Sequence, residues 1–142
     1  MNETFNSYYS SIKFTNEYTE DSDYAYVNDY NTTGQQLVDL IQQKWKIDVP
    51  KLVINVLGSE NSGYLPSNVR KCFRKGIIKS AGFTRGMIFT DGSNSGISRH
   101  IGAAKRQFSN ISKFTTNIPV IGFNTFRKVH LGNELFSHLN NF

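Results

Sequence analysis

Three short apolar runs, separated by two amphipathic segments, constrain the fold of this chain more than any other feature. The runs are "KLVINVL" (51–57), "GMIFT" (86–90) and "IPVIGF" (118–123), and the segments between them cover 65–82 and 95–108. Short apolar runs rich in β-branched residues predict strands, and neighbouring strands joined through a helix are parallel. We therefore predict an α/β fold with a mostly parallel sheet. The run at 51–57 predicts a strand that is buried on both faces.

The spacing of apolar residues predicts three helices. "TTGQQLVDLIQQKW" (32–45) has helical periodicity, with Thr32 or Thr33 available as the N-cap. In the segment 65–82, one stripe of apolar side chains contains Leu65, Val69, Cys72, Phe73 and Ile77. The stripe predicts that the Cys72 side chain lies in the core. The opposite side of this helix carries most of the basic residues Arg70, Lys71, Arg74 and Lys75.

The charge distribution divides the chain near residue 32. Residues 1–32 hold one basic and six acidic residues, whereas the rest of the chain holds fifteen basic and five acidic residues. We interpret residues 1–31 as an acidic, disordered leader, in which "YAYV" (24–27) has the weak alternation of an edge strand. Residues 32–128 are then the folded domain, and 129–142 form a C-terminal tail of uncertain structure.

Composition excludes several classes of protein. No run of about 18 apolar residues is present, so no segment of the chain is expected to span a membrane directly. The single cysteine, Cys72, cannot form an internal disulfide, which favours a reducing compartment. We interpret the basic residues of 65–82 as a solvated helix face and expect no nucleic-acid groove. His100 has no neighbouring cysteine or carboxylate, so no metal site is expected.

Polar, glycine-containing segments follow all three predicted strands, at 57–63, 90–96 and 122–126. Ligands of open α/β sheets bind beyond the carboxyl ends of the strands, and a helix that begins near Asn94 would present N–H groups to an anion. The candidate ligand-binding residues are therefore Gly58, Ser59, Gly92, Ser93, Asn94, Ser95, Gly96 and Gly122. An alternative stays open, in which the glycines only permit tight turns.

Three parts of the chain resemble the N-terminal cytosolic region of melastatin-type transient receptor potential (TRPM) cation channels. They are "DVPKLVINVLGSE" (48–60), "FRKGIIKSAGFTRGMIFTDGSNSGISRHIGAA" (73–104) and "IGFNTF" (121–126). The resemblance implies the SLOG fold, a Rossmann-like three-layer sandwich, here truncated after the third strand. It also implies a regulatory or assembly domain, or a fragment of one, at the cytosolic face of a calcium-permeable channel. The implied partners are other domains or subunits of the channel, and the implied ligand is an ADP-ribose-like nucleotide.

The chain departs from the family pattern at the strand ends. Glu60 follows the first strand, and Asp91 stands in place of the first glycine of the second loop. A carboxylate about 5 Å from a phosphate repels it by roughly 3 kcal/mol at an effective dielectric constant near 20. We therefore predict a degenerate nucleotide site. Asp91 is a candidate to cap the following helix instead, by accepting from the N–H group of Asn94 or Ser95.

Two other classes of function stay open. One is a SLOG-type protein that binds or processes nucleotides, although the later Gly-Gly-x-Gly-Thr segment of such hydrolases is absent from the sequence. The other is a stand-alone protein-interaction module with a basic surface. No Ser-His-Asp order and no paired carboxylates point to catalysis, so we expect no enzyme.

Overall fold

The computed structural model describes residues 8–12, 22–28, 30–58, 64–108 and 118–125. The chain divides into two compact units. The first contains residues 1–49 and 131–142, and the second contains residues 50–130. Each unit is described by itself.

The first unit contains an antiparallel pair of strands within the acidic N-terminal segment. β1 (Tyr8–Ile12) pairs with β2 (Ser22–Tyr26), and Tyr8 lies opposite Tyr26. The prediction of a disordered leader is therefore wrong for these two stretches. Tyrosine favours extended backbone, and both strands contain it, so their β propensity outweighs the polar composition of the segment around them.

After the two strands, the first unit contains the helix that the sequence predicts at 32–45. α1 (Gly34–Asp39) begins after Thr33, whose hydroxyl accepts from the N–H group of Gln36, while the Gln36 side chain accepts from the N–H group of Thr33. This capping box confirms Thr33 as the N-cap. The helix widens into a π-helical stretch, η1 (Leu40–Lys44), in which the Trp45 N–H group donates to the Leu40 carbonyl.

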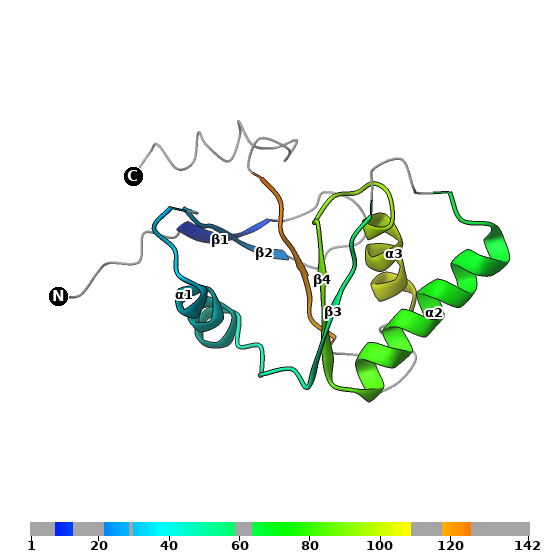
Figure 1. Cartoon of the computed structure of the whole chain (residues 1–142), viewed down its shortest axis with the longest axis horizontal. Coiled ribbons are helices and arrows are strands. Elements are labelled where there is room, and N and C mark those ends of the chain that lie inside the picture. The colour runs from blue at the N-terminus through cyan, green and yellow to red at the C-terminus, as the bar shows by residue number, and fades with distance from the viewer. Residues whose placement is uncertain (1–7, 13–21, 29, 59–63, 109–117, 126–142) are drawn as a thin grey trace. The chain divides into compact units, whose positions relative to one another are not determined.

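The second unit is built on a three-stranded parallel sheet (Figure 1). Its strands are β3 (Leu52–Asn55), β4 (Gly86–Thr90) and β5 (Val120–Gly122), in the spatial order β3-β4-β5. In the register, Ile54 lies beside Ile88, and Ile88 lies beside Val120. The predicted α/β class with a parallel, Rossmann-like sheet is confirmed.

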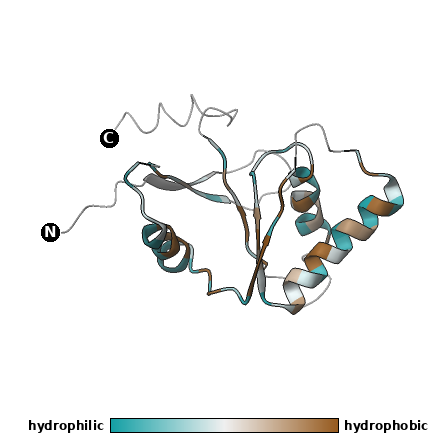
Figure 2. Cartoon of the chain, in the orientation of Figure 1, coloured by the Kyte–Doolittle hydropathy of each residue, from teal (hydrophilic) through white to brown (hydrophobic). Residues whose placement is uncertain are grey.

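Two helices make the crossovers between these strands. α2 (Ser67–Phe83) joins β3 to β4, and α3 (Ser98–Phe108) follows β4. Both lie on the same side of the sheet (Figure 1), as expected for two successive crossovers of the same hand. They bury one continuous core with the apolar strands (Figure 2): Val56, Ile78, Ala81, Ile88, Ile101, Ala104 and Ile118.

The prediction that the strand after Pro50 is buried on both faces is wrong. Leu52 and Val53 are 42% and 49% exposed, whereas Ile88 in β4 is 0% exposed. β4 occupies the centre of the described sheet, while β3 is at its edge. The apolar run therefore identified a strand correctly but not its position in the sheet.

The prediction that Cys72 lies in the core is also wrong, because its side chain is exposed. The buried stripe of α2 is displaced by about one position from the predicted one, and it consists of Phe73, Ile77, Ile78 and Ala81. The displacement also brings Arg74 into a half-buried position. Among the helices that the structure describes, none combines the length and apolar character needed to cross a membrane.

Candidate functional site

The loops predicted to bind a ligand all start where the strands end, at the carboxyl end of the sheet, because the strands are parallel. Strand pairing extends just past the strand ends: the Val56 N–H group donates to the Phe89 carbonyl at 2.8 Å, and the Phe123 N–H group donates to the Thr90 carbonyl at 2.9 Å. We call the residues 90–96 together with 122–123 the carboxyl edge. The second of these hydrogen bonds holds the ends of β4 and β5 beside each other, and the first does the same for β3 and β4.

Gly92 and Gly122 lie against each other across the carboxyl edge. A Cβ atom on Gly122 would lie 2.5 Å from the Gly92 Cα atom, and a Cβ atom on Gly92 would lie 3.2 Å from the Gly122 Cα atom. Gly92 also has a φ angle of +68°, which side chains with a Cβ rarely adopt. The two glycines are therefore required by backbone contact, independently of any ligand.

Asp91 forms a local network with the serines that follow it. Its Oδ1 atom accepts from the Ser93 N–H group at 2.9 Å and from the Ser93 hydroxyl at 2.8 Å. The Ser93 and Ser95 hydroxyl oxygens are 2.9 Å apart. Because Asp91 accepts from the residue two positions on, it forms an Asx turn. The expectation that it accepts from Asn94 or Ser95 is wrong in this detail.

The helix after this loop begins later than predicted. α3 starts at Ser98, whereas the sequence predicts a start near Asn94. Gly96 is buried and has a φ angle of +50°, which is incompatible with right-handed helix, so the loop runs on for one more turn. The predicted N–H groups of a helix end therefore lie farther along the chain from β4 than the sequence indicated.

The predicted site residues fall into three groups. Six of them come from the two joined segments of the carboxyl edge: Gly92, Ser93, Asn94, Ser95, Gly96 and Gly122. Asn94 in the same loop is exposed, and Gly58 is exposed beyond β3. Ser59 and Glu60 lie outside the described residues. The assignment of these residues to a ligand stays a prediction.

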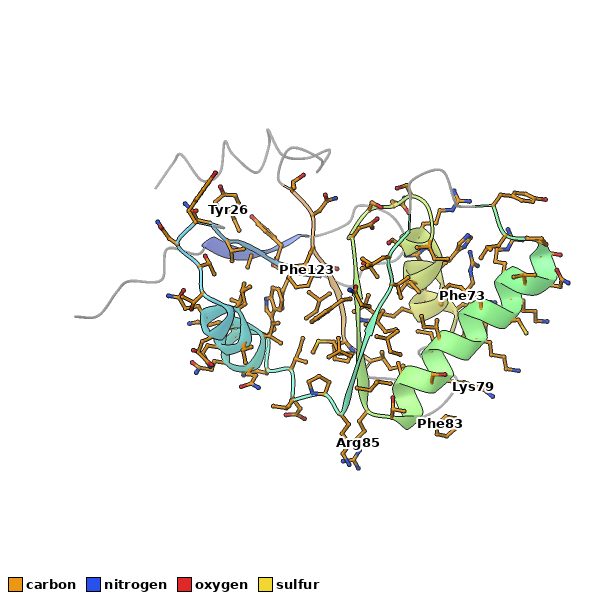
Figure 3. All side chains as sticks on the ribbon, viewed as in Figure 1. Tyr26, Phe73, Lys79, Phe83, Arg85 and Phe123 are labelled. Atoms are coloured by element: carbon orange, nitrogen blue, oxygen red, sulfur yellow. The ribbon has the colours of Figure 1, made fainter. Side chains whose placement is uncertain are left out.

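Two contacts at the carboxyl edge were not anticipated from the sequence. The Thr90 hydroxyl oxygen accepts from the Gly92 N–H group at 3.1 Å, and Thr90 is buried. The rings of Phe89 and Phe123 pack edge to face, with centroids 5.2 Å apart and an angle of 89° between their planes; Phe123 is labelled in Figure 3. Both contacts add to the rigidity of this edge, and neither is signalled by a sequence motif.

A second feature missed by the sequence analysis is a set of arginines on α2 and α3, which we call the arginine face: Arg70, Arg74, Arg99 and Arg106. An Nη atom of Arg74 lies 3.0 Å from Nδ1 of His100, which is 1% exposed. Burial lowers the pKa of Arg74, and so do three nearby positive charges, those of Arg70, Arg99 and Arg106. The sequence predicts that the basic side chains of α2 form a solvated helix face. Arg74 differs from this prediction, because its side chain is half-buried.

Within the described part of the chain, no cluster of three or more His, Cys, Asp or Glu residues is placed to hold a metal ion. His100, the only histidine among the described residues, contacts Arg74, and a positive group beside the ring disfavours a bound cation.

Known proteins resemble this chain over most of its length. A family model described as "SLOG in TRPM" matches residues 23–140. Transient receptor potential cation channel subfamily M member-like 2 from Nematostella vectensis is 32% identical over 111 residues, which are 78% of this chain and 7% of that protein. Subfamily M member 6 from Homo sapiens is 34% identical over 118 residues, 80% of this chain and 6% of that protein. The chain thus spans a small part of these curated relatives.

Proposed function

The chain belongs to the family of SLOG domains in TRPM channels, and on this basis we propose that it acts as an N-terminal cytosolic regulatory and assembly region of a TRPM-like, calcium-permeable cation channel. The match over residues 23–140 supports the proposal, since it includes the whole parallel sheet and all of β2 except its first residue. Other domains or subunits of the channel are then its partners. Its location would be the cytosolic face of the membrane that holds the channel.

The exposed edge of the sheet supports an assembly role. Leu52 and Val53 of β3 are about half exposed, and Leu57, which follows the strand, is 78% exposed. An apolar strand at a sheet edge tends to pair with or be covered by other polypeptide. The edge is thus suited to contact with further parts of a larger protein.

The nucleotide site of this domain is proposed to be degenerate, and one observation carries this part of the proposal. The Asp91 carboxylate occupies the loop after β4 and accepts from both the N–H group and the hydroxyl of Ser93. An incoming phosphate would lose that N–H donor and meet the carboxylate charge. The repulsion of about 3 kcal/mol at roughly 5 Å exceeds the attraction of about 0.3–1 kcal/mol that an exposed helix N-terminus provides.

No catalytic step is part of the proposed function. His100 is buried beside the Arg74 guanidinium group, so its ring is not open to a substrate. We expect the chain to leave ADP-ribose unchanged on incubation, as checked by chromatography of the nucleotide. Formation of AMP would favour the alternative of a nucleotide-processing SLOG protein.

The test of the degenerate site is calorimetric titration of the 142-residue chain with ADP-ribose. We expect the unmodified chain to bind more weakly than about 1 mM, the range of a 4 kcal/mol interaction. Asp91→Asn keeps an oxygen acceptor for the Ser93 N–H group but removes the charge, so we expect an affinity gain of about tenfold or more, up to the roughly 3 kcal/mol repulsion.

The matched control is Asp48→Asn, which removes one exposed carboxylate outside the second unit and should leave the affinity unchanged. Micromolar binding by the unmodified chain would show that the site is intact. An Asp91→Asn variant that folds normally but gains no affinity would show that this carboxylate is not the obstacle.

A further inference from the structure

The second unit carries a large excess of positive charge. Residues 64–108 contain nine basic residues and a single acidic residue, Asp91. The Asp91 carboxylate lies in the loop after β4, where it accepts two hydrogen bonds from Ser93. The positive charges of α2 and α3 therefore have few counter-charges close to them in the sequence.

Four of these charges are brought together where α2 and α3 pack. Arg74 of α2 reaches His100 of α3 at 3.0 Å, so its guanidinium group lies between the two helices. A Cβ atom on Gly102 would lie 3.6 Å from Nη1 of Arg106, which shows that the Arg106 side chain lies back along α3 over Gly102. Arg99, Gly102 and Arg106 share one helix face because they are spaced by three and four residues.

The arrangement is unfavourable for the chain on its own. Like charges three or four residues apart destabilise a helix, and Arg70 and Arg74 have this spacing. Across the helices, the charges of Arg70, Arg99 and Arg106 add to burial in lowering the pKa of Arg74. An anionic partner would add an attraction to each of these positive charges and so offset their mutual repulsion.

We propose that the arginine face is a docking surface for an acidic segment of a protein partner. Arg70 and Arg74 are separated by about 6 Å along α2, and Arg99 and Arg106 by about 10 Å along α3. Charges spread over this length match a series of carboxylates better than one phosphate group. Guanidinium groups also bind carboxylates through two parallel hydrogen bonds, and arginine is enriched among the residues that dominate protein interfaces.

A nucleic-acid partner fits the surface less well. Single strands are bound by exposed aromatic rings set among the basic residues. Within α2 and α3, Phe73 and Phe108 pack against the core, and the exposed ring is that of Phe83 at the far end of α2. Phe83 lies about 13 Å along the helix from Arg74, so it is not interleaved with the four arginines.

The test measures fluorescence anisotropy of a labelled peptide of eight glutamates, titrated with the 142-residue chain at about 50 mM salt, where surface charges are weakly screened. A peptide of eight glutamines is the uncharged control. The face variant combines Arg70→Gln with Arg99→Gln, both at exposed positions. The matched variant combines Lys51→Gln with Arg85→Gln, which removes the same charge at two exposed positions. Arg85 follows the C-terminal end of α2 (Figure 3), whereas Arg70 lies in the first turn of this helix. Lys51 is beside Arg85, because the Lys51 N–H group donates to the Arg85 carbonyl.

We expect the unmodified chain to bind the glutamate peptide and not the glutamine peptide. The face variant should bind about tenfold more weakly, as expected for the loss of two exposed ion pairs, and the matched variant should change less than twofold. Equal weakening of both variants would overturn the proposal, since net charge alone would then explain binding. So would the absence of peptide binding, or a stronger, face-dependent binding of pyrophosphate, of phosphatidylserine vesicles or of single-stranded RNA. Circular dichroism establishes that each variant is folded.

Discussion

The carboxyl edge of the sheet and the arginine face of α2 and α3 are both polar surfaces of the second unit, but they differ in how their polar groups are partnered. At the carboxyl edge, Asp91 bonds to Ser93, and Thr90 bonds to Gly92. At the arginine face, like charges lie near one another. A glycine- and serine-rich loop can thus be polar for structural reasons, whereas like charges held close together are the better sign of an available binding surface.

The largest expected effect concerns the backbone contact at the carboxyl edge. Gly122→Ala would place a Cβ atom 2.5 Å from the Gly92 Cα atom, and neither backbone segment can move without disturbing strand pairing. We expect a loss of about 2–3 kcal/mol in the free energy of unfolding, the upper part of the range for overpacking. Urea unfolding followed by circular dichroism measures it.

Gly76→Ala is the matched control for this change. A Cβ atom on Gly76 would meet nothing within 4 Å, and the residue lies inside α2. Alanine is favoured over glycine in a helix by about 0.5–1 kcal/mol, so this variant should be more stable than the unmodified chain. If both variants lost the same stability, the glycines of the carboxyl edge would not be rigidly packed.

An intermediate effect is expected from the Asx turn. Asp91→Ala removes the acceptor for the Ser93 N–H group and hydroxyl, and we expect a loss of about 1 kcal/mol, because the group is half-buried and each hydrogen bond contributes about 0.5–1.5 kcal/mol. Asp91→Asn retains an acceptor and should lose less than half as much. Thermal unfolding of both variants checks this. Equal losses would mean that the charge, and not the turn, stabilises the loop.

The smallest effect is expected at the arginine face and has the opposite sign. Arg99→Gln removes one repulsion from the set around Arg74, so we expect a gain of about 0.3–0.5 kcal/mol at low salt. About 1 M salt should abolish the gain, since it shortens the screening length to roughly 3 Å. Lys79→Gln, which removes one positive charge at an exposed position of α2, is the control. A loss of stability in Arg99→Gln at both salt concentrations would show that the face is internally stabilised.

The alternation of elements was predictable from the sequence. The strands β4 and β5 and the helices α2 and α3 lie close to the predicted ranges, because apolar periodicity reflects burial directly. The N-cap at Thr33 was predictable because it depends on local sequence alone: the capping box uses residues three positions apart. The exposure of Leu52 and Val53 was not predictable, because the position of a strand in the sheet depends on neighbours far away in the sequence.

The candidate site was only partly predictable. The sequence placed glycines and serines after successive strands, but it could not show that Gly92 contacts Gly122 or that Asp91 selects Ser93. The late start of α3 depends on the left-handed conformation of Gly96, which a glycine permits but does not require. The proximity of Arg74 to Arg99 and Arg106 arises from helix packing, and no motif records it.

The contact between Gly92 and Gly122 also affects how mutations at these two positions combine during evolution. Each residue lacks a side chain because the other backbone occupies the space where a Cβ atom would lie, so the cost of a mutation at one position depends on the residue at the other. Changes at contacting positions do not add, and here the first substitution would already separate the two segments and lessen the penalty of the second. In evolutionary terms the two glycines are epistatic: replacing both of them requires passing through a single substitution that destabilises the fold.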